Sequence, residues 1–92
     1  MLGVLKCNIF EITDDDPATN ILSRNPESGL LIVGLGGSAN TYPGLYSLTR
    51  NNSVNVIMAG ASVSSVTCNA SSITINKNDK GRATVVWIPI QN

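Results

Sequence analysis

The fold class is set by one C-terminal stretch, Ser72-Ile73-Thr74-Ile75-Asn76, which continues through Lys77-Asn78-Asp79-Lys80-Gly81 into Ala83-Thr84-Val85-Val86-Trp87-Ile88-Pro89-Ile90. β-branched residues dominate the first and third segments, and such residues favour the pleated backbone of a strand. The middle segment is rich in the Asn, Asp and Gly residues that form turns. The stretch therefore predicts a β-hairpin whose two strands are joined by a loop of about five residues.

Further strands are predicted in the middle of the chain. The apolar run Gly29 to Gly34 is too short for a helix of ordinary length and is closed by glycines. It indicates a strand buried on both faces near the centre of a sheet. The segments Leu45 to Thr49 and Val54 to Met58 flank Arg50-Asn51-Asn52-Ser53. Because Asn tolerates positive φ, this arrangement predicts a second hairpin.

The N-terminal third is predicted to contain a strand and a helical turn. From Leu2 to Thr13 apolar residues alternate with polar ones, but the alternation changes phase within the run. This change indicates a β-bulge or a strand covered on both faces. Asp16 followed by Pro17 is typical of an N-cap and first helical residue. We therefore expect one helical turn from Pro17 to Leu22, with Ile21 and Leu22 packed against the core.

With Val63 to Cys68 as a further strand, the chain contains about seven short strands, spaced by roughly 8–12 residues with turn residues between them. This pattern predicts an all-β fold, a small antiparallel β-sandwich with at most one helical turn. A jelly-roll arrangement and a small barrel are alternatives with the same pattern. The length of 92 residues, without an internal linker, predicts a single domain spanning residues 1–92.

The final strand, Ala83 to Ile90, is apolar on both faces, because residues on either side of the pleat are mostly Val, Ile, Ala and Trp. Pro89 cannot donate a ladder hydrogen bond, which confines it to an edge strand or to a strand end. An edge strand that is apolar on both faces favours aggregation when it is left in water. We therefore expect a partner to cover this strand, either in a homo-oligomer (a dimer or trimer) or as a neighbouring subunit of an assembly.

The composition excludes several classes of partner. Charged residues make up 13% of the chain, and six Lys and Arg balance six Asp and Glu, so there is no basic field for nucleic acid or anionic lipid. No apolar run approaches the roughly 20 residues of a transmembrane helix. The N-terminus lacks the pattern of a secretory signal. We expect no membrane span, and a location in a virion or in the cytoplasm.

Catalytic and metal-binding residues are scarce. The chain has no histidine, which excludes Ser-His-Asp and Cys-His arrangements, so we expect neither an enzyme nor a cofactor. Asp14, Asp15 and Asp16 offer oxygen ligands for Ca²⁺, but they lack the spacing that wraps a loop around one ion. A helix cap and a solvated loop are the preferred interpretation of these acids. Cys7 and Cys68 lie in apolar runs and are expected to be reduced residues of the core.

The few aromatic residues are the remaining candidates for a binding site. Tyr42, Tyr46 and Trp87 could stack on sugar rings, which gives a carbohydrate-binding or adhesion module as the alternative function. A lone Trp in an apolar strand is more often part of the core or of a subunit contact. The interface or ligand candidates are Tyr42, Tyr46, Trp87, Ile88 and Ile90.

The last third of the chain has a distinctive composition. It comprises the run Ser62-Val63-Ser64-Ser65-Val66-Thr67-Cys68-Asn69-Ala70-Ser71-Ser72-Ile73-Thr74-Ile75-Asn76, the Asp79 to Gly81 turn and the Trp-containing final strand. This composition resembles that of β-modules in bacteriophage tails and fibres, which are low in charge, rich in Ser, Thr, Asn and Gly, and usually trimeric or otherwise oligomeric. The resemblance transfers no functional residue. It implies a non-enzymatic structural or attachment module that acts through oligomerisation.

Overall fold

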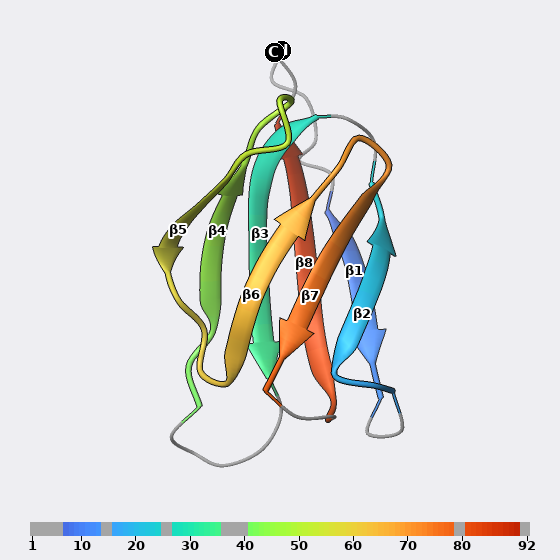
Figure 1. The fold of residues 1–92 in the computed structure, drawn as a ribbon, viewed down its shortest axis with the longest axis vertical. Coiled ribbons are helices and arrows are strands. Elements are labelled where there is room, and N and C mark those ends of the chain that lie inside the picture. Colours follow the sequence, from blue (N-terminus) through green and yellow to red (C-terminus); the bar gives the residue numbers. More distant parts are fainter. Residues whose placement is uncertain (1–6, 14–15, 25–26, 36–40, 79–80, 91–92) are drawn as a thin grey trace.

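Residues 7–13, 16–24, 27–35, 41–78 and 81–90 are described by a computed structural model of the chain. Within these ranges the regular elements are eight β-strands, with no helix (Figure 1). The strands are β1 (Asn8–Ile12), β2 (Thr19–Ser23), β3 (Ser28–Leu35), β4 (Gly44–Leu48), β5 (Val54–Met58), β6 (Val63–Cys68), β7 (Ser72–Lys77) and β8 (Ala83–Ile90). Every pair of neighbouring strands is antiparallel.

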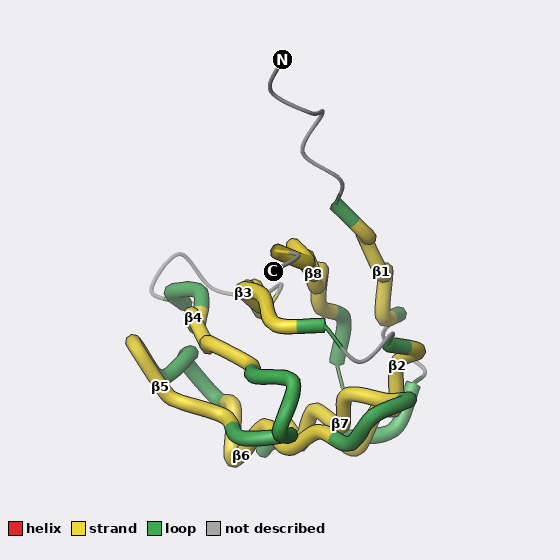
Figure 2. The backbone as a smooth tube through the Cα atoms, turned by 90° about the horizontal axis from the view of Figure 1, so that it is seen from above, coloured by secondary structure: helices red, strands yellow, loops and turns green. Residues whose placement is uncertain are grey.

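The strands form two sheets that pack against each other. The large sheet has five strands in the order β1-β8-β3-β4-β5, and the small sheet has three in the order β2-β7-β6. Figure 2 shows these two layers from above, with the small sheet below the large one. The prediction of an all-β antiparallel sandwich is confirmed, with eight strands in place of about seven.

β7 and β8 belong to different sheets, so the predicted hairpin between them is wrong. β7 lies between β2 and β6, whereas β8 lies between β1 and β3. The inward side chains of both strands are buried, Ile73 and Ile75 from β7 and Val85 and Trp87 from β8. In opposite sheets these two apolar stripes face each other across the interior, which removes more apolar surface from water than pairing edge to edge.

β8 is an interior strand of the large sheet, and the expectation of an edge strand is wrong. β3 pairs with the whole of β8, whereas β1 pairs with β8 only as far as Trp87. Pro89 therefore lies past the described end of β1, opposite Gly29 on β3. A strand end is the other position that the missing N–H of proline permits.

The predicted helical turn from Pro17 to Leu22 is also wrong, because most of it forms β2. This strand pairs with β7 along its whole length, and its side chains alternate between the interior, as Leu22, and solvent, as Ile21. Asp16 caps a turn instead of a helix, since its Oδ2 accepts hydrogen bonds from the N–H and Oγ1 of Thr13 at 2.7 and 3.1 Å. One helical turn is costly to nucleate, whereas the β7 ladder pairs the backbone of the segment.

The core lies between the two sheets. β3 is the middle strand of the large sheet, as predicted, and it buries Leu31 and Val33 completely. Its opposite face is only half-buried, so β3 is fully covered on one face and not on both. The other buried apolar residues are Ile12, Tyr46, Leu48, Val66, Ile73, Ile75, Ala83, Val85 and Trp87.

The predicted hairpin around Asn51 and Asn52 is confirmed as the β4–β5 turn. Asn52 has a φ of 67°, and its N–H donates to the carbonyl of Thr49 at 3.1 Å. The N–H of Thr49 donates in turn to the carbonyl of Ser53 at 3.0 Å. A tight turn followed by a left-handed residue closes a three-residue hairpin loop, and Asn accepts that conformation more readily than most residues.

The N-terminal strand and the cysteines differ in part from prediction. β1 pairs with β8 in regular register, so its described part contains no bulge, and residues 2–6 of the predicted strand lie outside the described residues. Cys7 and Cys68 are unpaired. Cys68 packs against the core, but Cys7 is exposed because it is in phase with the outward-facing Ile9.

Candidate functional site

A continuous row of apolar side chains crosses the outward side of the large sheet, which also carries the polar Ser28, Ser47, Asn55 and Thr84. The register places Ile9 beside Val86, Val86 beside Ile32, Ile32 beside Leu45, and Leu45 beside Met58. One apolar row therefore crosses all five strands. With their outward neighbours these residues make up the aliphatic face: Ile9, Leu30, Ile32, Leu45, Met58, Val86, Ile88 and Ile90.

The aliphatic face is almost without charge. The single charged residue in the strands of the large sheet is Glu11, which lies on the edge strand β1. Its Oε2 accepts a hydrogen bond from the Oγ1 of Thr84 at 3.1 Å. The outer face of an antiparallel sheet that borders water is ordinarily polar, so the apolar row is the feature of this surface that needs an explanation.

The outward side chains of the small sheet are polar by contrast. They make up the hydroxyl face: Thr19, Ile21, Ser23, Ser65, Thr67, Ser72, Thr74 and Asn76, of which only Ile21 is apolar. The Oγ1 of Thr19 donates to the Oδ1 of Asn76 at 2.8 Å, and the Nδ2 of Asn76 donates to the Oγ of Ser65 at 2.9 Å. This row of hydrogen bonds crosses β2, β7 and β6, so the hydroxyl face satisfies much of its own polarity.

Arg24, directly after β2, is a buried cation at one end of the sandwich, with 6% of its surface exposed. Its guanidinium donates to the carbonyls of Glu27 and Thr49, both at 2.6 Å, to the carbonyl of Asn69 at 2.9 Å and to the Oδ1 of Asn52 at 3.3 Å.

These acceptors belong to three separate connections, β2–β3, β4–β5 and β6–β7. The guanidinium also lies 5.6 Å from the centroid of the Trp87 ring, close enough for a cation–π contact. Its Nε is buried without a hydrogen-bond partner among the described residues. The other donors of Arg24 are directed at oxygens of the protein itself. Arg24 therefore connects the three loops by hydrogen bonds, and the arrangement does not form a site for an anion.

Lys77 is a second buried cation, at the end of β7. Its side chain points inward in phase with Ile75 and is 4% exposed. Its Nζ donates to the carbonyl of Gly81, and its N–H donates to the carbonyl of Ala18 at 2.9 Å. Lys77 therefore connects β7 to the segments before β2 and before β8.

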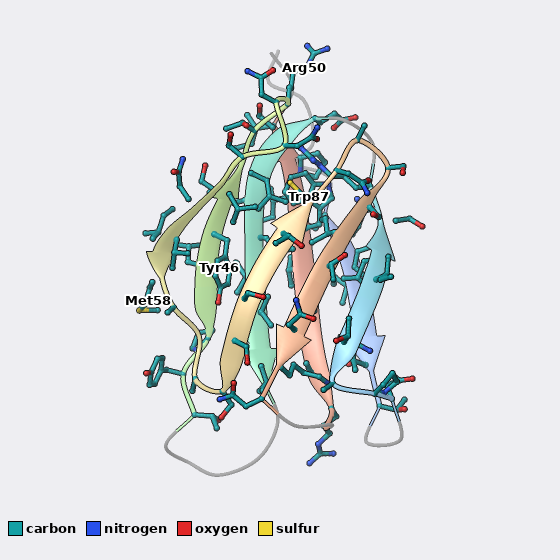
Figure 3. The ribbon with its side chains drawn as sticks, viewed as in Figure 1. Tyr46, Arg50, Met58 and Trp87 are labelled. Atoms are coloured by element: carbon teal, nitrogen blue, oxygen red, sulfur yellow. The ribbon has the colours of Figure 1, made fainter. Side chains whose placement is uncertain are left out.

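The predicted interface and ligand residues are not brought together. Trp87 and Tyr46 are each 2% exposed and lie inside the sandwich (Figure 3), so Trp87 has the core position that its apolar strand favoured, and neither ring is open to a ligand. The hydroxyl of Tyr46 accepts the N–H of Gly60 at 3.0 Å. Tyr42 is 54% exposed, and Ile88 and Ile90 lie on the aliphatic face.

The calcium candidates are only partly described. Asp14 and Asp15 lie outside the described residues, and Asp16 binds Thr13. Within the described ranges no three Cys, Asp or Glu side chains gather in a way that could hold a metal ion. The same ranges contain no helix with the length and apolarity to cross a membrane.

No protein-family model, curated protein or solved structure matches this chain. The function is therefore argued from the surfaces of the molecule. Sequence reasoning had identified the apolar character of β3 and β8, which supply five of the eight residues of the aliphatic face. Ile9, Leu45 and Met58 join that face only through the strand register, and Arg24 carries no sequence signal that separates it from a surface arginine.

Proposed function

We propose that this chain is a non-enzymatic structural module of a larger assembly, of the kind found in virions and phage tails, and that it assembles through the aliphatic face. The observation that carries the proposal is the apolar row from Ile9 to Met58, which crosses the whole large sheet on the side away from the core. Burying such a row is the main source of favourable free energy in association.

The occupant that we propose for the aliphatic face is a second copy of the chain. A face without charge, apart from Glu11 at its border, meets an identical face without electrostatic repulsion. Five strands about 4.8 Å apart and about 20 Å long give a face of roughly 500 Å². Two such faces would bury roughly 1,000 Å², the lower limit for a specific interface.

The carbohydrate-binding alternative has little support. It depended on three exposed aromatic rings, of which Tyr46 and Trp87 lie in the core. Tyr42 is exposed, but a single ring without a neighbouring aromatic residue makes a poor platform for a sugar. No observation on the described surface favours this function.

The proposal is tested by the mass of the chain in solution, measured by light scattering over a wide range of concentration. The variant combines Ile32→Thr with Leu45→Thr, two changes in the centre of the apolar row that keep or add β-branching and so suit a strand. A dimer related by a two-fold axis loses four apolar side chains in this variant. We expect its dissociation constant to rise by about 100-fold or more.

The matched control combines Thr67→Ser with Thr74→Ser on the hydroxyl face, and it should associate like the unchanged chain. Because apolar burial drives the contact, association should persist at high salt. A chain that stays monomeric at every concentration, or a Thr variant that associates as well as the control, would contradict the proposal.

A further inference from the structure

β5 is an edge strand whose first half, Val54 to Val56, pairs regularly with β4 and has little protection against further pairing; the one irregularity of the β4–β5 ladder is a bulge at Ile57. It has a neighbour in the large sheet on one side only, and Figure 1 shows it at a lateral border of the molecule. Three successive side chains are largely exposed, Val56 at 59%, Ile57 at 58% and Met58 at 46%. β5 contains no charged residue and no proline, although these are the features that commonly block edge-to-edge pairing.

The three other edge strands differ from β5. β1 carries Glu11, and β2 and β6 are built largely from Ser, Thr and Asn. β5 is also exposed on its inner side. Val56 is the cross-strand partner of the buried Tyr46, so it faces inward, and it is nevertheless exposed. Met58 points away from the body of the sandwich (Figure 3). β5 is therefore the described edge with the most uncovered apolar surface.

The backbone of β5 is also oriented for pairing. The N–H of Thr49 bonds to the carbonyl of Ser53, which makes these two residues a hydrogen-bonded pair at the start of the ladder. Hydrogen-bonded and non-bonded pairs alternate along an antiparallel ladder. Asn55 therefore directs its backbone groups at β4, whereas Val54 and Val56 direct theirs at the open edge.

We infer that β5 pairs antiparallel with β5 of a second copy, about a two-fold axis that passes beside Asn55. In this register Val54 of each copy lies opposite Val56 of the other, and both use the backbone groups that face the open edge. The two Asn55 residues lie opposite each other as a non-hydrogen-bonded pair. The two large sheets then form one continuous sheet of twice the width.

A second copy fits this edge better than an unrelated strand. Val54 and Val56 are alike in shape and face the same side of the sheet, so the edge complements itself when its direction is reversed. The charged residue nearest to β5 in sequence is the exposed Arg50 at the tip of the β4–β5 turn, and Figure 3 shows it at one end of the molecule. Antiparallel pairing keeps the two Arg50 side chains at opposite ends of the joined strands, whereas parallel pairing would place them side by side.

The edge contact goes beyond the proposed contact through the aliphatic face, because it uses a different surface and a different symmetry axis. The axis of the edge contact is perpendicular to the sheet, and that of the face contact lies parallel to it. Two perpendicular two-fold axes that intersect generate a closed assembly of four copies. Two wide sheets would then be packed through their aliphatic faces.

The test is a cysteine cross-link at the two-fold axis. Asn55→Cys is made together with Cys7→Ser and Cys68→Ser, and oxidised glutathione serves as the oxidant. A non-hydrogen-bonded pair separates its Cα atoms by about 4.5 Å, which lies within the range of about 4.4–6.8 Å that a disulfide spans. We expect rapid formation of a covalent dimer, seen on a non-reducing gel.

The control is Thr67→Cys in the same background, since Thr67 is an exposed residue of another edge strand, β6. It should cross-link at least tenfold more slowly, a conservative margin for a distance effect of this kind. Equal rates for the two cysteines would overturn the inference.

A second variant, Val56→Pro, removes one N–H that faces the open edge and leaves the β4 ladder intact. If both contacts form, the unchanged chain has the mass of four copies, and Val56→Pro should reduce it to two. The Ile32→Thr and Leu45→Thr variant should instead leave the cross-linkable edge dimer, so failure of either contact is seen separately. A Val56→Pro chain that melts like the unchanged chain and keeps its full mass would also overturn the inference.

Discussion

The two sheets distribute polarity in opposite ways. The large sheet is apolar on its inner side and carries a second apolar surface, the aliphatic face, on its outer side. The small sheet is polar on its outer side, and it supplies both buried cations, Arg24 directly after β2 and Lys77 at the end of β7. Unsatisfied polarity and exposed apolar surface both cost free energy. The small sheet satisfies most of its polarity through internal hydrogen bonds, with the Oδ1 of Asn20 and the Nε of Arg24 as the buried exceptions among the described residues, whereas the large sheet leaves its outer apolar surface partly exposed.

The sequences of the strands differ between a sheet that borders water on one face and a sheet that is covered on both faces. A sheet that borders water on one side is expected to alternate between apolar and polar residues, as β7 does. A sheet covered on both sides consists of near-continuous apolar runs, as in β3 and β8. The small sheet therefore has the sequence of an outer layer, whereas β3 and β8 have the sequence that the proposed contact through the aliphatic face requires.

The largest effect is expected from Arg24→Met, which tests whether the buried polarity of the small sheet is structural. The change leaves the partly buried carbonyls of Glu27, Thr49 and Asn69 without this donor, and each lost hydrogen bond to a charged group costs about 1.5–3 kcal/mol. We expect the free energy of unfolding to fall by about 3 kcal/mol or more, which corresponds to a drop in Tm of more than about 12 °C.

Urea unfolding followed by Trp87 fluorescence measures this effect directly, because the ring lies beside the guanidinium. Arg24→Lys is the matched variant, since it keeps the charge but cannot reach all of the acceptors, and it should fall between Arg24→Met and the unchanged chain. A loss below about 1 kcal/mol for Arg24→Met would mean that the three loops hold their positions without the cation.

The strands were predictable where local chemistry decides the structure. Asn52 accepts positive φ, and the β4–β5 hairpin forms around it as expected. The segment Lys77 to Gly81 also shows where the chain reverses, but turn residues do not determine whether the next strand joins the same sheet or the opposite one. That choice depends on Ile75 and Trp87 being buried in one core between the two sheets, an arrangement that the sequence alone does not determine. Pro89 was misleading for a related reason, because its missing N–H is compatible with an edge strand and with a strand end alike.

The candidate site was predictable only in part. The two-sided apolar character of β8 indicated a covered surface, and that part of the reasoning led to Ile88 and Ile90. Leu45 looks like an ordinary strand residue until the register places it between Ile32 and Met58. Arg24 was missed because its inward position follows from β2, and β2 was predicted as a helical turn.

A smaller effect is expected from Lys77→Met, which compares the two buried cations of the small sheet. The Nζ of Lys77 has one acceptor in the described chain, the carbonyl of Gly81, whereas Arg24 has four. Met has a similar length and leaves no charge in the interior. The free energy gained by no longer burying a charge therefore offsets most of the free energy lost with the hydrogen bond. We expect the free energy of unfolding in urea to change by less than about 1 kcal/mol. A loss as large as that of Arg24→Met would show that the two ends of the sandwich depend equally on buried charge.

The smallest effect is expected from Asn76→Ala on the hydroxyl face. This change breaks the hydrogen bonds to Thr19 and Ser65, but all three side chains have access to water, which replaces the lost partners. We expect the free energy of unfolding to fall by about 0.5 kcal/mol. The mass in solution should not change, because the proposed contacts use the aliphatic face and the β5 edge. A loss of association in Asn76→Ala would mean that the small sheet also contacts a partner, and the contrast between an outer and an inner layer would then be wrong.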